Sequence, residues 1–106
     1  MLSRTPYHPG ETLAYFLEDM HITPYRLSQA TGMTQTHVSQ ILKHQRGITA
    51  ETALRLGLFF GNTPDFWMNL QKAYELDTAS QAKGAAIVDR VVPWQGTATP
   101  GMGAMV

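Results

Sequence analysis

Apolar residues recur at helical spacing along the first three quarters of the chain. In the first such stretch Leu13, Phe16, Leu17 and Met20 follow i, i+3, i+4, i+7 spacing, which places them on one face of a helix. Similar stripes follow further along the chain. The pattern predicts five helices, over residues 10–20, 24–31, 35–44, 50–60 and 64–74. The last helix could extend beyond residue 74.

Capping residues set most of these boundaries. Threonine stands before four of the predicted helices and proline follows it in two of them, which is the preferred N-cap followed by the preferred first-turn residue. Gly32 and Gly61 supply left-handed stops. The fourth helix is expected to bury Ala53, Leu54, Leu56 and Phe60.

The C-terminal third is less clearly patterned. Residues 77–83 are polar, and residues 85–92 are apolar again with Val88, Val91 and Val92 β-branched, so they fit a helix end or a short strand equally well. Residues 95–106 carry no charge and are rich in glycine, which predicts a loose tail. We expect one domain over residues 8–92, with a dimerisation segment at its C-terminal end, followed by this tail.

The composition narrows the function classes. A chain of 106 residues with 43% hydrophobic residues builds one modest core. It has no cysteine, which excludes disulfides and thiolate metal sites, and no apolar run near the roughly 20 residues of a membrane span. We therefore expect a cytoplasmic protein.

The charges are unevenly distributed although they sum to zero. Between Met20 and Ala50 there is no Asp or Glu, while Arg26, Lys43 and Arg46 give this window a charge of +3. The remainder carries −3. An acid-free window suits a surface that faces the phosphates of a nucleic acid, because a carboxylate there would be repelled.

The second and third predicted helices form a helix-turn-helix, a pair of short helices joined by a tight turn that contains Gly32. If Val38 and Ile41 anchor the third helix to the core, its outward face is polar and free of acids. Glutamine bonds adenine in a bidentate way, threonine offers a hydroxyl and a methyl group, and Lys43 or Arg46 suits a phosphate. The predicted DNA-binding residues are Thr23, Tyr25, Thr34, Gln35, Thr36, His37, Ser39, Gln40, Lys43 and Arg46.

Several short motifs extend this interpretation. They are residues 8–11 (HPGE), 25–28 (YRLS), 38–41 (VSQI), 46–49 (RGIT), 51–56 (ETALRL), 59–61 (FFG), 64–71 (PDFWMNLQ) and 74–76 (YEL). Together they resemble the HigA antitoxins of the Xre, or phage-repressor-like, helix-turn-helix class. The resemblance implies an all-α, five-helix fold and a homodimer that binds double-stranded operator DNA. It also implies repression of the protein's own operon and neutralisation of a HigB-like toxin that cleaves messenger RNA on the ribosome.

The resemblance also assigns roles within the helix-turn-helix. Gln35, Thr36 and Gln40 match positions where phage repressors read bases, and His37 matches a position that touches the DNA backbone. Pro24 departs from the pattern, because it stands where those repressors often have a phosphate-binding glutamine. Thr23, Tyr25 or the helix N-terminus must replace that contact.

Three other function classes compete with this interpretation. An enzyme is disfavoured because no catalytic motif is present, and His37 and His44 would lie roughly 10 Å apart along a helix, too far for one metal ion. No cofactor, metal or small-molecule substrate is expected. A module that has lost DNA binding is disfavoured, because it should carry acids on the third helix, and that helix has none. A stand-alone Xre-type regulator without a toxin stays open, because the loss of a neighbouring gene leaves no mark in this sequence.

Overall fold

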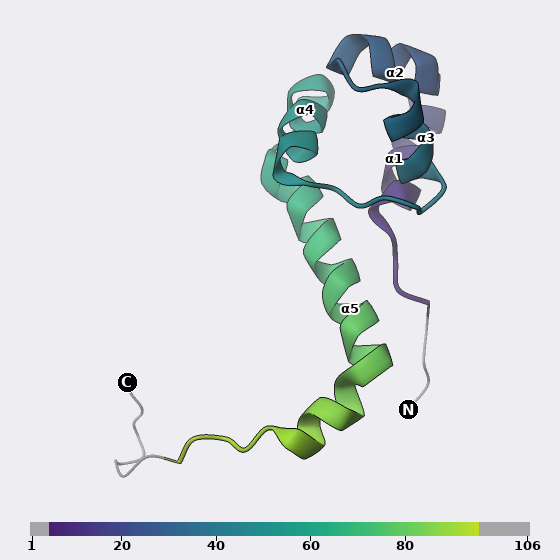
Figure 1. Cartoon of the computed structure of the whole chain (residues 1–106). Helices are drawn as coiled ribbons and strands as arrows, with labels where there is room; N and C mark the ends of the chain where they lie inside the picture. The colour runs from purple at the N-terminus through teal and green to yellow at the C-terminus, as the bar shows by residue number, and fades with distance from the viewer. Residues whose placement is uncertain (1–4, 96–106) are drawn as a thin grey trace.

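The computed structural model describes residues 5–95, and within them it contains five helices and no strand. The first four helices form a compact body, and the last one leaves that body as a long arm (Figure 1). The helices are α1 (Pro9–Asp19), α2 (Pro24–Thr31), α3 (Gln35–Leu42), α4 (Ala50–Phe60) and α5 (Pro64–Arg90).

The predicted caps are confirmed. The hydroxyl oxygens of Thr23, Thr34 and Thr63 accept hydrogen bonds from the backbone N–H three residues later, at 3.1, 3.0 and 3.2 Å. Gly32 and Gly61 end α2 and α4 with φ of 76° and 75°. At these positions the local sequence therefore satisfies the free N–H and C=O groups of the helix termini.

The core lies between α1, α2, α3, α4 and the start of α5. Leu13, Leu27, Ile41, Leu56 and Trp67 are fully buried there. The indole N–H of Trp67 donates to the Asn62 side chain at 3.0 Å, so the largest core residue keeps its polar atom paired.

The prediction that Met20 and Leu54 are buried in the core is wrong. Met20 is 46% and Leu54 is 54% exposed. α1 ends at Asp19, so Met20 lies in the cap, where the helical phase no longer points inward. In α4 the buried stripe runs through Ala53, Leu56 and Gly57, and Leu54 lies about 100° from Ala53 around the helix.

The boundaries of α3 and α5 also differ from the prediction. α3 ends at Leu42 rather than His44, because Lys43 is its C-cap and His44 takes a φ of +63°. α5 continues through the polar residues 77–83 and through Ala85 to Arg90. Of the two structures that the sequence left open for residues 85–92, the helix end is confirmed and the strand is wrong. Alanine, glutamine and lysine in this stretch are good helix formers, which explains why it stays helical without a partner.

The remaining expectations concern the ends of the chain and membranes. Residues 96–106 of the predicted tail lie outside the described part of the structure. None of the described helices is both long and apolar enough to cross a membrane.

Candidate nucleic-acid interface

The turn between α2 and α3 is held from two sides. On the α2 side Ser28 is only 5% exposed, and so small a side chain lets neighbouring helices approach closely. On the other side, the Arg55 guanidinium of α4 donates to the Thr31 carbonyl at 2.7 Å. α4 thereby binds the free C-terminal end of α2 and fixes the position of Gly32 in the turn.

A groove between α2 and α3, which we call the α2–α3 groove, brings most of the predicted site residues together. Its lining residues are Pro24, Tyr25, Gln35, Thr36, Ser39, Gln40, Lys43 and Gln45. The lining contains amides, hydroxyls and one ammonium group, and no acid. Such a set matches the donors and acceptors on base edges in the DNA major groove.

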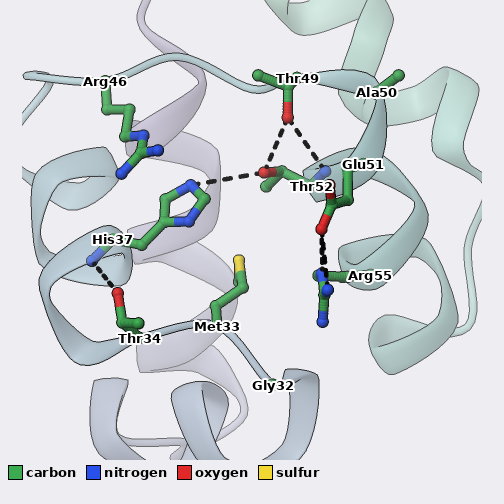
Figure 2. A pocket seen from close by; sticks show the side chains of 10 residues that line it. All are labelled: Gly32, Met33, Thr34, His37, Arg46, Thr49, Ala50, Glu51, Thr52 and Arg55. Carbon is green, nitrogen blue, oxygen red and sulfur yellow. Dashed lines mark hydrogen bonds and ion pairs between the residues drawn. The ribbon is translucent and has the colours of Figure 1, made fainter.

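Thr34, His37 and Arg46 lie instead beside a second hollow, between α3 and α4, which we call the α3–α4 pocket. Figure 2 shows the Arg46 guanidinium close to the His37 ring. The pocket is lined by Gly32, Met33, Thr34, His37, Arg46, Thr49, Ala50, Glu51, Thr52 and Arg55. His37 is thus on the α4 side of the recognition helix, while the glutamines face the groove.

The surroundings of the His37 ring favour its neutral form. Its Nε2 lies 3.5 Å from the Thr52 hydroxyl, which also accepts a hydrogen bond from Thr49 at 3.1 Å. Burial lowers the pKa of His37, and the nearby charges of Arg46 and Arg55 lower it further, against a smaller opposing effect of Glu51. At neutral pH the positive charge of this pocket therefore comes from its arginines.

Thr23 and Tyr25 occupy the N-terminal end of α2. Tyr25 is 56% exposed and lies in the α2–α3 groove. Thr23 lies just outside that groove and caps α2. Its oxygen accepts the cap hydrogen bond, and its hydroxyl hydrogen stays available as a donor.

Several contacts around the interface have no local sequence signal. Arg55 and Glu51 form the i, i+4 pair that their spacing predicts, at 2.9 Å, but the Thr31 partner of Arg55 is 24 positions away. Gln71 of α5 is 8% exposed and accepts a hydrogen bond from the Ile48 N–H at 2.7 Å. Gln45 was likewise not predicted, although it lines the α2–α3 groove.

No group of three or more His, Asp or Glu side chains among residues 5–95 is arranged to hold a metal ion.

The fold, the turn at Gly32 and the polar groove together define a helix-turn-helix protein of the five-helix class.

No protein-family model matches the chain. Antitoxin HigA-1 of Vibrio cholerae is 40% identical over 69% of this chain and 70% of its own length. An uncharacterized HTH-type transcriptional regulator of Haemophilus influenzae is 35% identical over 72% of each chain.

Solved structures extend the similarity along α5. An addiction module antidote protein of the HigA family from Coxiella burnetii is 41% identical, with a TM-score of 0.83 over 86% of this chain and 100% of its own. The Pseudomonas aeruginosa antitoxin HigA, solved with the higBA promoter, is 43% identical, with a TM-score of 0.80 over 83% of this chain and 97% of its own. The chain belongs to the HigA antitoxin family.

Proposed function

We propose that this protein is a DNA-binding antitoxin that represses its own operon and neutralises a HigB-like toxin that cleaves messenger RNA on the ribosome. The α2–α3 groove is the observation that carries the proposal, because it gathers acid-free hydrogen-bonding side chains on the exposed side of a helix-turn-helix. Membership of a family whose Pseudomonas aeruginosa member was solved with promoter DNA supports it. The protein acts in the cytoplasm, where its operator and its toxin are.

In this function α3 enters the major groove of the operator. Gln35, Thr36, Ser39 and Gln40 face the base edges from the α2–α3 groove. The phosphates on either side are bound by two groups of residues. On the side of the α3–α4 pocket these are Thr34, His37 and Arg46, and on the side of the α2–α3 groove they are Lys43, Thr23, Tyr25 and the N-terminus of α2.

A stand-alone regulator is the second candidate function. The similarity to the Haemophilus influenzae protein, described only as a transcriptional regulator, favours it. The two candidates share the DNA interface and differ only in the presence of a toxin partner.

Two measurements test the proposal. The protein should bind a duplex from the region upstream of its own gene more tightly than a scrambled duplex, at several salt concentrations. Co-expression with the product of the adjacent reading frame should give a complex and rescue growth, also when α3 is mutated. Equal binding to both duplexes would refute the DNA function, and binding without any complex would leave the stand-alone regulator.

A further inference from the structure

The side chain of Gln40 already has a partner within the protein. An Nη1–H of Arg46 donates to the Oε1 of Gln40, with the two atoms 3.2 Å apart. The chain turns back to make this contact. His44 takes a positive φ of 63°, and the Gln45 N–H donates to the Gln40 carbonyl at 2.8 Å.

Arg46 donates to Gln40 because the other polar side chains near it are engaged elsewhere. The carboxylate that lines the same pocket, Glu51, is engaged by Arg55, because its Oε2 accepts from Nη2 and Nε of Arg55 at 2.9 and 3.3 Å. The ring beside Arg46 belongs to His37, whose Nε2 is directed to Thr52. The guanidinium carries five N–H donors, so one bond to Gln40 leaves others for a phosphate.

This contact occupies one of the two acceptor positions of Oε1 and so favours the Nε2 end of the amide for contacts in the groove. A glutamine reads adenine in a bidentate way with both ends, its oxygen accepting from the base amine and its nitrogen donating to N7. With Oε1 bound to Arg46, the Nε2 donors have no partner among residues 5–95, and the guanidinium adds further donors beside them. Guanine presents two acceptors, O6 and N7, on its major-groove edge, whereas adenine presents one acceptor and one donor.

We propose that Arg46 is a positioning residue that orients the Gln40 amide and makes the pair read guanine rather than adenine. This inference rests on the proposed DNA-binding function. It assigns to Arg46 a role in base choice in addition to a phosphate contact, which by itself carries no sequence information.

Selection from a pool of duplexes with a randomised palindromic half-site tests the proposal. The base pair read by Gln40 is the one whose preference disappears in Gln40→Ala. At that position the wild-type protein should enrich guanine over adenine by roughly fivefold or more, and Arg46→Ala should reduce this ratio below about twofold or reverse it.

Lys43→Ala is the matched control. It also removes one exposed cation at the end of α3, and no hydrogen bond joins Lys43 to Gln40 within residues 5–95. It should lower the affinity for all duplexes and leave the ratio of guanine to adenine unchanged. In the Gln40→Ala background, Arg46→Ala should change no base preference further. Arg46 is exposed, so each variant should keep the fold, and thermal melting of each variant checks this.

The outcomes separate this inference from the function on which it rests. If the wild-type protein enriches no sequence at all, the proposed DNA function fails. If it enriches a sequence but prefers another base than guanine at the Gln40 position, the positioning role is refuted. The same holds if Arg46→Ala weakens every duplex evenly, as Lys43→Ala does.

Discussion

His8 shows how one buried side chain ties two elements together. Its Nδ1 accepts a hydrogen bond from the Gly10 N–H at 2.9 Å and so caps α1. Its ring stacks on His44 with 4.7 Å between centroids, and Tyr74 of α5 packs edge-on at 4.8 Å. Only 3% of His8 is exposed.

The environment of His8 opposes its protonation. Burial lowers the pKa of His8 below its ordinary value of 6.5, and His44 lowers it further. Glu11 and the backbone of Arg46 act in the opposite direction with smaller effect. A proton on Nδ1 would also remove the acceptor that caps α1.

We expect the free energy of unfolding to fall as the pH falls below about 6.5. The unfolded chain takes up a proton at the ordinary histidine pKa, whereas folded His8 takes it up only at lower pH, so stability is complete above this window and decreases within it. His8→Asn keeps a capping oxygen and does not titrate, so it should flatten the dependence. Urea unfolding between pH 5 and pH 8 measures it.

His21→Asn is the control for this series, because His21 is exposed and its φ of 56° suits asparagine. It should leave the pH dependence of the wild-type protein in place. His37, whose pKa is also lowered, contributes in the same direction and stays constant in both variants. Parallel curves for the wild-type protein and His8→Asn would contradict the role of His8.

At the scale of elements, the connection from α3 to α4 depends on α5. The buried Gln71 side chain accepts from the Ile48 N–H at 2.7 Å and donates to Glu75 at 2.8 Å. A Cβ at Gly47 would come within 2.7 Å of the Gln71 amide, so the connection needs glycine there to approach α5 this closely. Gln71 thus positions the segment that carries Arg46.

Gln71→Ala should lower the free energy of unfolding by about 1–3 kcal/mol, because it leaves the Ile48 N–H buried without a partner. Lys72→Ala, an exposed neighbour on the same helix, should change it by less than about 0.5 kcal/mol. Urea denaturation of the three proteins measures the difference. Equal stability of both variants would mean that water or another acceptor replaces the amide.

Within α3, Gln40 and Lys43 should contribute to DNA binding in different ways. Gln40→Ala should cost about 1–3 kcal/mol on the operator and little on random DNA, because it removes a base contact. Lys43→Ala should weaken both about equally and reduce the salt slope by about one unit per monomer. Binding isotherms at several salt concentrations measure both effects.

Val38→Asp serves as the contrast in these measurements, because Val38 is fully buried and a charge there should unfold the domain. The opposite pattern, with Gln40→Ala weakening both duplexes alike and Lys43→Ala only the cognate one, would contradict the placement of α3 in the major groove.

The whole molecule is elongated because α5 leaves the body. Its radius of gyration is 18.8 Å, against about 12–13 Å for a compact chain of this size. The far half of α5 and the segment after it expose apolar side chains, which are Leu76, Ile87, Val88, Val91, Val92 and Trp94. Monomeric soluble proteins rarely expose so many large apolar side chains on one element.

We therefore expect a dimer that uses this arm and places two recognition helices about 34 Å apart, one turn of DNA, on a palindromic site. Sedimentation at micromolar concentration should give twice the mass of the chain. Ile87→Asp together with Val91→Asp should give a folded monomer that binds one half-site. A wild-type monomer both free and on DNA would contradict the prediction.

The sequence by itself determined the helices and the face of α3 that lines the groove. Its caps and glycine stops act within four residues, so Thr23, Pro24 and Gly32 suffice to bound α2 at Pro24–Thr31 as predicted. The same local spacing places Gln35, Thr36, Ser39 and Gln40 together, because helix geometry fixes which residues share a face.

Only the tertiary structure decided which residues support that face. The contacts of Arg55 with Thr31 and of Gln71 with Ile48 join residues 24 and 23 positions apart, and no periodicity in the chain encodes them. The same is true of the exposure of Leu54 and of the turn that brings Arg46 to Gln40. The hydrophobic and polar pattern shows which face of a helix is buried and which is exposed. Packing between helices decides which distant residue contacts each face.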